Sequence, residues 1–245
     1  MAYTKFAVVA GHNAIVPGAS GNGYKEHEVA RQMAAKVLEY LEAVGVTAYD
    51  CTDDVGTTQT QCWTNAVNNT NAAIGSDGLA ISIHLNSGGG TGTEVLYYDQ
   101  ATLAGNVSSA VSGAMGISNR GAKQRTDIGY LNSTYAPAIL IELCFIDSAT
   151  DMQKLMANFD KVAEAIVETV TGKTLNGING VVKVLVDGLN IRTGPSTSYP
   201  VSGQAVKDQL YNVVYFKDDW YQILVPNADK GWIFGNNGVY VQRIS

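Results

Sequence analysis

Two of the chain's three histidines stand where the sequence pattern changes. His12 follows the apolar run "FAVVAG" and begins a glycine-rich segment, while His84 lies near the end of the apolar run "LAISIHLN". Glu26 follows "GNGYK", at the expected start of a helix. Two imidazoles and one carboxylate form a standard protein ligand set for catalytic zinc, with the fourth position left for water. The ordinary alternatives are hydrogen-bonded structural histidines and a glutamate that suits the first turn of a helix.

A second carboxylate draws attention because its surroundings are apolar. Glu142 lies within the run "AILIELCF". Burial of an unpaired carboxylate is strongly unfavourable, so we expect Glu142 either to have a partner or to take part in a reaction. In the second case it would be a general base that acts on a water molecule at a metal. The alternative is an ion pair with a buried arginine such as Arg120 or Arg125.

Alternating strands and helices are predicted over the first 170 residues or so. The apolar runs at 6–11, 79–86, 93–99 and 138–145 predict strands, and a helical period marks residues 28–45 and 151–170. This alternation is typical of an α/β layered domain. Strand ends at one edge of such a sheet meet at a crevice, where ligands commonly bind, so we expect His12 and His84 to lie near each other.

The pattern changes after residue 170. The segment "TGKTLNGING" (171–180) has the composition of a linker, and short β-like runs follow it to the end of the chain. Those runs predict a small all-β barrel. We therefore expect a catalytic domain at 1–172, a linker at 173–180 and a β domain at 181–245.

Composition excludes several kinds of partner. The chain has 245 residues and a net charge of −6, with no basic block, which argues against nucleic-acid binding. No apolar run is long enough to cross a bilayer, so no membrane insertion is expected. We identify no signal peptide at the N-terminus and expect synthesis in the cytoplasm. The sparse cysteines Cys51, Cys62 and Cys144 suit a reducing compartment.

Three segments carry a family resemblance. They are "AGHN…GNGYKEHEVARQMAAKVLEYLEAVGV", "ISIHLNSGGGTGTEVLYY" and "PAILIELCFIDSATDMQKL". In this order they resemble the signatures of zinc-dependent N-acetylmuramoyl-L-alanine amidases of the amidase-3 type, over most of residues 4–170. The resemblance implies a mixed six-stranded sheet flanked by helices, and cleavage of the amide between muramic acid and L-alanine of peptidoglycan. It also implies His12, Glu26 and His84 as Zn2+ ligands and Glu142 as the catalytic carboxylate.

The chain departs from this family at two places. The first ligand lies in "VVAGHN", which lacks an aspartate and a second pair of glycines that the family often has there. Cys144 lies two residues beyond Glu142, and we expect a core residue rather than a site residue there. Glu28 competes with Glu26 as a ligand, but the helical stripe leaves Glu28 solvated. We expect His27 to lie at the surface or behind the ligands.

The C-terminal part resembles a bacterial SH3 (SH3b) module through "LNIRTGPS", a Trp-Tyr pair and "GWI". The implied role is binding to cell-wall peptidoglycan, although Trp220 or Trp232 could instead fill a small barrel core. Together, the two resemblances suggest a bacteriophage endolysin, made in the host cytoplasm and released to the wall by a holin. The alternatives are a host autolysin, an inactive peptidoglycan-binding protein and a zinc carboxypeptidase.

Overall fold

The chain forms two compact units. The computed structural model describes residues 3–175, 180–225 and 228–244. The chain divides into Met1–Thr174 and Leu175–Ser245. This division falls within the segment predicted as a linker, of which residues 176–179 lie outside the described residues. The exact domain limits, at residues 172 and 181, stay a prediction.

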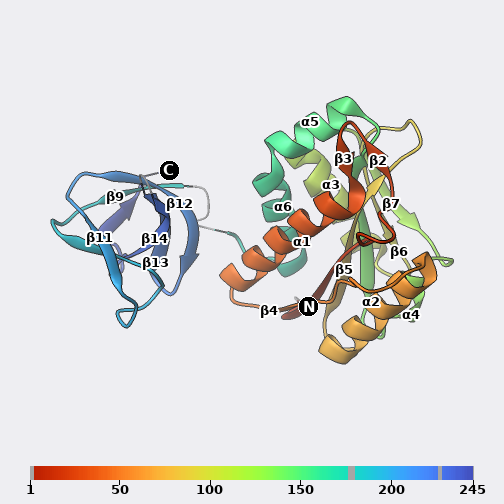
Figure 1. Cartoon of the computed structure of the whole chain (residues 1–245), viewed down its shortest axis with the longest axis horizontal. Coiled ribbons are helices and arrows are strands. Elements are labelled where there is room, and N and C mark those ends of the chain that lie inside the picture. Colours follow the sequence, from red (N-terminus) through yellow and green to blue (C-terminus); the bar gives the residue numbers. More distant parts are fainter. Residues whose placement is uncertain (1–2, 176–179, 226–227, 245) are drawn as a thin grey trace. The chain divides into compact units, whose positions relative to one another are not determined.

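A mixed six-stranded sheet forms the centre of the first unit, as expected from the sequence (Figure 1). Its strands lie in the order β4-β1-β5-β8-β6-β7. The first four are parallel, β6 runs antiparallel to β8, and β7 is parallel to β6. The bounds are Lys5–Ala10 (β1), Thr47–Asp50 (β4), Leu79–Asn86 (β5), Thr93–Tyr97 (β6), Asn119–Gln124 (β7) and Ala138–Phe145 (β8). A short hairpin, β2 (Ser20–Gly21) and β3 (Tyr24–Lys25), stands apart from the sheet.

Helices cover both faces of this sheet. On one face α1 and α3 both pack against α6, and on the other α2 packs against α4 (Figure 1). Their bounds are Glu26–Ala43 (α1), Gln59–Ile74 (α2), Ala101–Met115 (α3), Gly129–Ser133 (α4) and Phe159–Thr171 (α6). Since both faces are covered, β1, β5 and β8 are buried along nearly their whole length.

The single helix expected at 151–170 is wrong, because two helices occupy this region. Helix α5 (Ala149–Ala157) ends and α6 begins at Asn158. The backbone N–H and the side-chain amide of Asn158 both donate to the carbonyl of Lys154, and its own carbonyl accepts from Val162. Asparagine side chains compete with helical hydrogen bonds in this way, so one residue both ends α5 and begins α6.

The strand pairing brings chemically active side chains to one place. In the parallel pair of β5 and β8, His84 lies opposite Glu142, and the register shifts between His84 and Asn86. On the other side of β8, Glu94 of β6 is the residue opposite Glu142. Glu142 therefore lies on the central strand β8, between a histidine and a second carboxylate.

The second unit is all-β in its described residues, as expected. Seven antiparallel strands follow the order β11-β10-β14-β13-β12-β9-β15. Their bounds are Gly180–Val184 (β9), Leu189–Arg192 (β10), Val201–Ala205 (β11), Leu210–Lys217 (β12), Trp220–Val225 (β13), Ala228–Phe234 (β14) and Val241–Arg243 (β15). A core of aliphatic residues and Tyr211 fills the interior.

Both tryptophans of the second unit are buried. Trp232 packs edge-on against Tyr215 with ring centroids 5.4 Å apart, and Trp220 packs on Phe234 at 5.1 Å. Each of these aromatic pairs adds stabilisation beyond the area that it buries. Trp220 and Trp232 therefore contribute to packing, which was one of the alternatives that the sequence left open.

In the part of the chain that the structure describes, none of the helices combines the length and the apolar composition needed to cross a bilayer.

Candidate active site

His12, Glu26 and His84 come together although they are far apart in the sequence. The Oε1 atom of Glu26 lies 3.4 Å from Nε2 of His12 and 3.1 Å from Nδ1 of His84. The ligand atoms of the three residues all lie within 4.8 Å of one another. Within the described ranges, this is the group of histidine, cysteine, aspartate and glutamate residues that is arranged to hold a metal ion.

Different elements supply the three side chains. His84 lies on β5, Glu26 is the first residue of α1, and His12 lies one residue beyond Gly11 at the end of β1. Gly11 continues the pairing of β1 with β5 by donating its N–H to the carbonyl of Ile83. The sheet edge and the start of the first helix therefore meet at the site, as the sequence predicted.

Two glycines leave room for these side chains. A Cβ atom on Gly11 would lie 2.2 Å from Cε1 of His84, and one on Gly18 would lie 2.5 Å from Oε2 of Glu26. Such distances are well below van der Waals contact, so neither position accepts a larger residue without displacing a site side chain. Gly18 also has a φ of +73°, which glycine adopts readily.

Glu26 is held as a charged acceptor. The backbone N–H groups of Ala19 and Leu85 donate to its two carboxylate oxygens, at 2.9 and 3.2 Å. Burial works to raise the pKa of Glu26, but the hydrogen bond from His84 and the nearby imidazoles outweigh it and lower the pKa below its usual value. An ionised, nearly buried carboxylate between two imidazoles is a suitable donor for a divalent cation.

Glu142 differs in having a buried oxygen that lacks a partner. Its Oε2 atom is buried and has no hydrogen-bond partner among the described residues. Burial is the main cause that raises the pKa of Glu142 to about 7, and the charges of Glu26 and Glu94 add to it. The alternative ion pairs are not formed, because Arg120 binds Glu94 and Arg125 binds Asp127. A carboxyl group with a pKa near neutrality is well matched to proton transfer.

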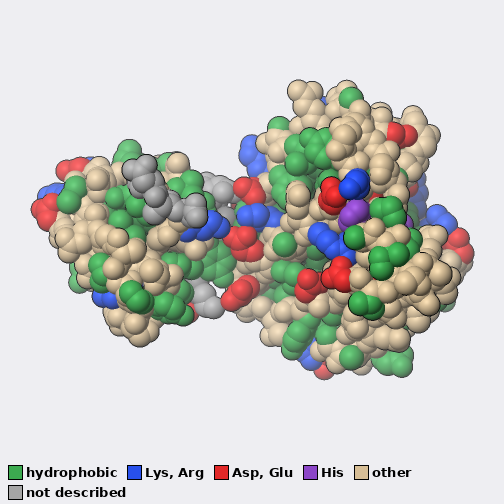
Figure 2. Space-filling view, viewed as in Figure 1, with side chains coloured by type: hydrophobic (Ala, Val, Ile, Leu, Met, Phe, Trp, Pro, Cys, Tyr) green, Lys and Arg blue, Asp and Glu red, His purple; other side chains and the backbone are tan. Residues whose placement is uncertain are grey.

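These four residues share one cavity. Its volume is about 540 Å³. Beyond His12, Glu26, His84 and Glu142, its wall includes Trp63 of α2, the Arg125–Asp127 pair and Tyr130. On this unit, Figure 2 shows acidic and basic side chains gathered around a histidine that is visible on this face. The cavity is therefore a polar chamber with aromatic residues in its wall, large enough for part of a peptide.

Three neighbours of the site residues stay outside this group. Glu28 is exposed and pairs with Lys25, as expected. Cys144 is fully buried against Met152 and takes no part in the cavity wall, which confirms the expectation of a core residue. His27 is buried too, so the surface location considered for it is wrong: its Nδ1 lies 3.3 Å from the carbonyl of Pro17, in the loop between His12 and Glu26.

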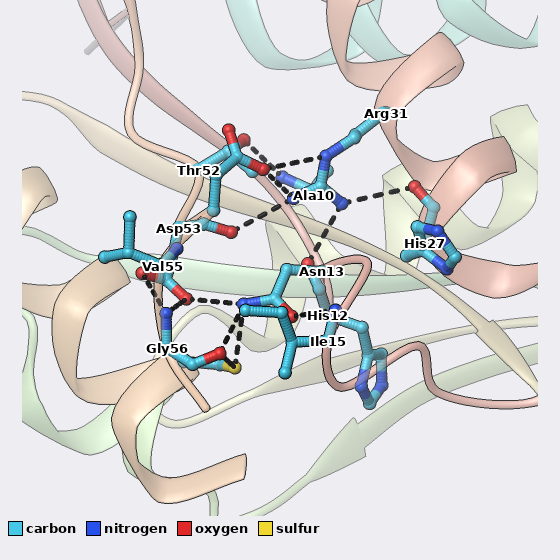
Figure 3. Close-up of polar contacts among 12 residues, drawn as sticks. Ala10, His12, Asn13, Ile15, His27, Arg31, Thr52, Asp53, Val55 and Gly56 are labelled. Carbon is cyan, nitrogen blue, oxygen red and sulfur yellow. Dashed lines mark hydrogen bonds and ion pairs between the residues drawn. The ribbon is translucent and has the colours of Figure 1, made fainter. Parts of the chain in front are cut away.

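A largely buried polar cluster beside His12 was not predicted from the sequence (Figure 3). It consists of Asn13, Arg31 and Asp53, which come from the loop after β1, helix α1 and the segment after β4. The departure at "AGHN" was the one available signal, since an asparagine there replaces a glycine that the family often has. Asp53, to which Asn13 donates, lies 40 residues further along the chain, and Arg31 lies 19 residues from His12, whose carbonyl it binds. Neither could be inferred from local pattern.

The side chains present fit a metal ion. Two imidazoles and an ionised carboxylate meet at one point, and an unpartnered carboxylate oxygen lies at the neighbouring strand. Nitrogen and oxygen donors in this combination suit zinc. The fold and these residues thus define a class: an α/β unit with three side chains arranged to hold a metal ion beside a buried carboxylate.

Comparison with known proteins gives the family. The model of the N-acetylmuramoyl-L-alanine amidase family (Amidase_3) matches residues 7–172, and a bacterial SH3 domain model matches residues 187–240. Because the first match covers more than half of the chain, this protein belongs to the Amidase_3 family.

Several relatives are similar to the first unit. The sporulation-specific N-acetylmuramoyl-L-alanine amidase of Bacillus subtilis is 32% identical over 160 residues, which cover 62% of this chain and 60% of the relative. CwlM, an N-acetylmuramoyl-L-alanine amidase of Bacillus licheniformis, is 29% identical over 184 residues, or 71% of this chain and 67% of CwlM.

A solved structure shares the fold. The catalytic domain of the CD27L endolysin, described as targeting Clostridia Difficile, superimposes with a TM-score of 0.63 at 26% identity, over 71% of this chain and 100% of that domain. The family match ends at residue 172, close to the division between the two units.

Proposed function

We propose that this protein is a zinc-dependent N-acetylmuramoyl-L-alanine amidase that cleaves the amide between N-acetylmuramic acid and L-alanine in peptidoglycan. The observation that carries the proposal is the meeting of His12, Glu26 and His84 beside the unpartnered oxygen of Glu142, in a chain of this family. His12, Glu26 and His84 would hold the zinc ion. When bound there, zinc supplies Lewis-acid chemistry by polarising a carbonyl group and making water more acidic.

Glu142 would act as the proton carrier. It takes a proton from the attacking water while the water oxygen bonds to the lactyl carbonyl carbon. It then gives that proton to the nitrogen of L-alanine as the carbon–nitrogen bond breaks, leaving a carboxylate on muramic acid and a free amino terminus on the stem peptide. The raised pKa of Glu142 supports both halves of this transfer, because the group can accept and release a proton near neutral pH.

The first prediction concerns the two roles within the site. Glu142→Gln keeps the size of the side chain but removes the proton acceptor, so we expect zinc to stay bound and hydrolysis to fall by about 10³-fold or more, the upper part of the range for general acid–base catalysis. His84→Ala should instead lose stoichiometric zinc. The measurements are metal analysis of the purified protein and turnover on purified walls, with and without a chelator.

Mass spectrometry of the products tests the bond that is cut. A free amino group on L-alanine supports the amidase, whereas release of a C-terminal residue from the stem would identify a carboxypeptidase. A wild-type protein that binds walls without cleaving them would identify a peptidoglycan-binding protein. Activity that is unchanged in Glu142→Gln would refute the role of this residue.

We propose that the SH3-like unit binds peptidoglycan and holds the enzyme at the wall. Tethering raises the local substrate concentration without any change in the active site. A protein cut after residue 174, at the division between the units, is expected to cleave soluble fragments at the full rate but to lyse intact cells several-fold more slowly. Equal lysis by the shortened protein would assign the second unit another role.

The likeness to an endolysin catalytic domain supports the proposal of a bacteriophage endolysin that is made in the host cytoplasm and reaches the wall through a holin. The likeness to a sporulation-specific Bacillus amidase supports a host autolysin instead. A holin gene beside the coding sequence favours the endolysin, and expression during host growth or sporulation favours the autolysin.

A further inference from the structure

His12 has an unusual backbone. Its φ is +63°, in the left-handed region that residues other than glycine seldom adopt. That conformation is unfavourable for a residue with a Cβ atom, which comes close to the following carbonyl oxygen. It persists where the surrounding structure fixes it. The contacts on each side of His12 show what does so.

The residue that follows is fixed by its own side chain. Asn13 is fully buried, and its Oδ1 accepts from the backbone N–H groups of Ile15 and Val16 at 2.9 and 2.8 Å. Its Nδ2 donates to Oδ2 of Asp53 at 2.9 Å and to the carbonyl of Gly56 at 2.8 Å. The amide group therefore uses both lone pairs and both protons, which leaves Asn13 a single orientation.

Asp53 is itself fixed from several directions. Its carboxylate accepts from the backbone N–H of Gly56 and from the side chain of Asn65 on α2, the latter at 2.8 Å. The side chain is nearly fully buried. A buried carboxylate with this many donors remains ionised and immobile, and these hydrogen bonds lower the pKa of Asp53 against the opposing effect of burial.

Arg31 completes the cluster from helix α1. One terminal nitrogen, Nη1, donates to the backbone carbonyl of His12 at 3.0 Å, and the other, Nη2, donates to the backbone carbonyl of Asp53, also at 3.0 Å (Figure 3). Helix α1 begins with Glu26, so this one guanidinium ties the helix that carries one proposed ligand to the backbone of another. Because the guanidinium group is planar and rigid, it fixes the positions of these two carbonyl groups relative to each other.

We propose that Asn13, Arg31 and Asp53 are positioning residues that hold His12 in its left-handed conformation and so set the distance from its imidazole to Glu26 and His84. This inference rests on the proposed metal site. None of the three is proposed to touch the metal or the substrate. They act through the backbone on either side of His12 and not through a hydrogen bond to its imidazole.

The test is zinc affinity in the full-length protein, measured by competition with a chromophoric chelator, together with the visible absorption of the Co2+-substituted protein. Loss of a group that orients a metal ligand typically weakens metal binding by about 10–100-fold. We expect Asn13→Ala to fall in that range and to change the Co2+ spectrum, because the imidazole of His12 is no longer held. Saturating zinc should restore part of the hydrolytic rate.

Ser108→Ala is the matched control. Ser108 is fully buried on α3, and its hydroxyl hydrogen-bonds Oδ1 of Asn119 at 2.7 Å. Its removal also deletes a buried hydrogen bond but leaves the cluster intact, so thermal stability should fall while zinc affinity and the Co2+ spectrum stay unchanged. Equal loss of zinc affinity in Ser108→Ala and Asn13→Ala would overturn the positioning role, since general loosening would then explain both.

Three further variants apply if Asn13→Ala fails to fold. Arg31→Gln removes the fork from a partly exposed side chain and should weaken zinc binding with the fold kept. Asn13→Asp alone sets two carboxylates against each other, whereas Asn13→Asp/Asp53→Asn exchanges the amide and the carboxylate and should recover part of the lost affinity. Failure of that recovery, together with unchanged zinc binding in Arg31→Gln, would overturn the proposal. A wild-type protein that takes up no zinc would instead refute the metal site itself.

Discussion

His84 and Glu142 lie on neighbouring strands in the middle of a sheet, whereas His12 lies at the start of a long loop. The first two are opposite one another in the parallel pair of β5 and β8, so backbone pairing alone fixes their separation. His12 has a left-handed backbone: its carbonyl accepts a hydrogen bond from Arg31, and the side chain of Asn13, the next residue, accepts one from the backbone N–H of Val16. One proposed site is thus built by two different means.

The contrast shows where positional accuracy comes from. A residue inside a sheet is held by regular strand pairing and by dense packing. Because the packing leaves no free space, any added atom displaces the neighbouring side chains directly. A residue in a loop keeps its place only if a local network is added. We therefore expect the strand side of the site to respond sharply to small steric changes, and the loop side to yield and respond more weakly.

The largest effect is expected for Gly11→Ala. The added Cβ would lie within 2.5 Å of three atoms of the His84 imidazole, which has to rotate out of the site because the strands cannot move apart. We expect zinc affinity to fall by at least about 100-fold, the top of the range for a disturbed ligand, with the secondary structure kept. Zinc competition and circular dichroism measure these outcomes; near-normal zinc binding would show that the strand side is able to yield.

Gly18→Ala tests the loop side in the same way. Its Cβ would meet Oε2 of Glu26 at 2.5 Å and the imidazole of His12 at 2.7 Å, and its φ is +73°. The nearest contact is 2.5 Å, against 2.2 Å at Gly11, and the loop can shift, so we expect a smaller loss of zinc affinity, about tenfold. A loss equal to that of Gly11→Ala would remove the distinction between strand and loop.

The smallest effect is expected for Gly23→Ala, in the turn between β2 and β3. Gly23 has a φ of +84° but no heavy atom within 4 Å of its added Cβ, so the substitution introduces backbone strain alone. We expect a loss of about 1 kcal/mol in the free energy of unfolding and no change in zinc affinity. This variant separates the effect of backbone strain from the effect of a steric clash with a site side chain. Weakened zinc binding would show that backbone strain alone is enough to disturb the site.

The parts of the structure that could be predicted are those whose signal is local. The strands at 79–86 and 138–145 have the predicted bounds, because an apolar run between polar residues marks a buried strand at both ends. The resemblance to the Amidase_3 signatures placed His12, Glu26 and His84, and the structure brings these three together. Their roles as ligands remain predictions.

The parts that were missed depend on contacts between distant residues. Asn158 interrupts a helical period that continues on both sides of it, and only its non-helical backbone, with a φ of −125°, reveals the break. The burial of His27 results from the path of the loop over it, and a helical stripe cannot show this. Asp53, 40 residues beyond Asn13, belongs to a segment with no strong pattern of its own.

The division of the chain after Thr174 has a consequence for evolution. All the residues proposed for chemistry, and those proposed to position them, lie between His12 and Glu142, and α6 ends at Thr171. Recombination at the junction would therefore replace the unit proposed to bind the wall without altering any hydrogen bond of the proposed catalytic apparatus. On this basis, we expect lineages that carry the same first unit to diverge fastest in the second unit, because the proposed wall binding can change while the proposed reaction stays the same.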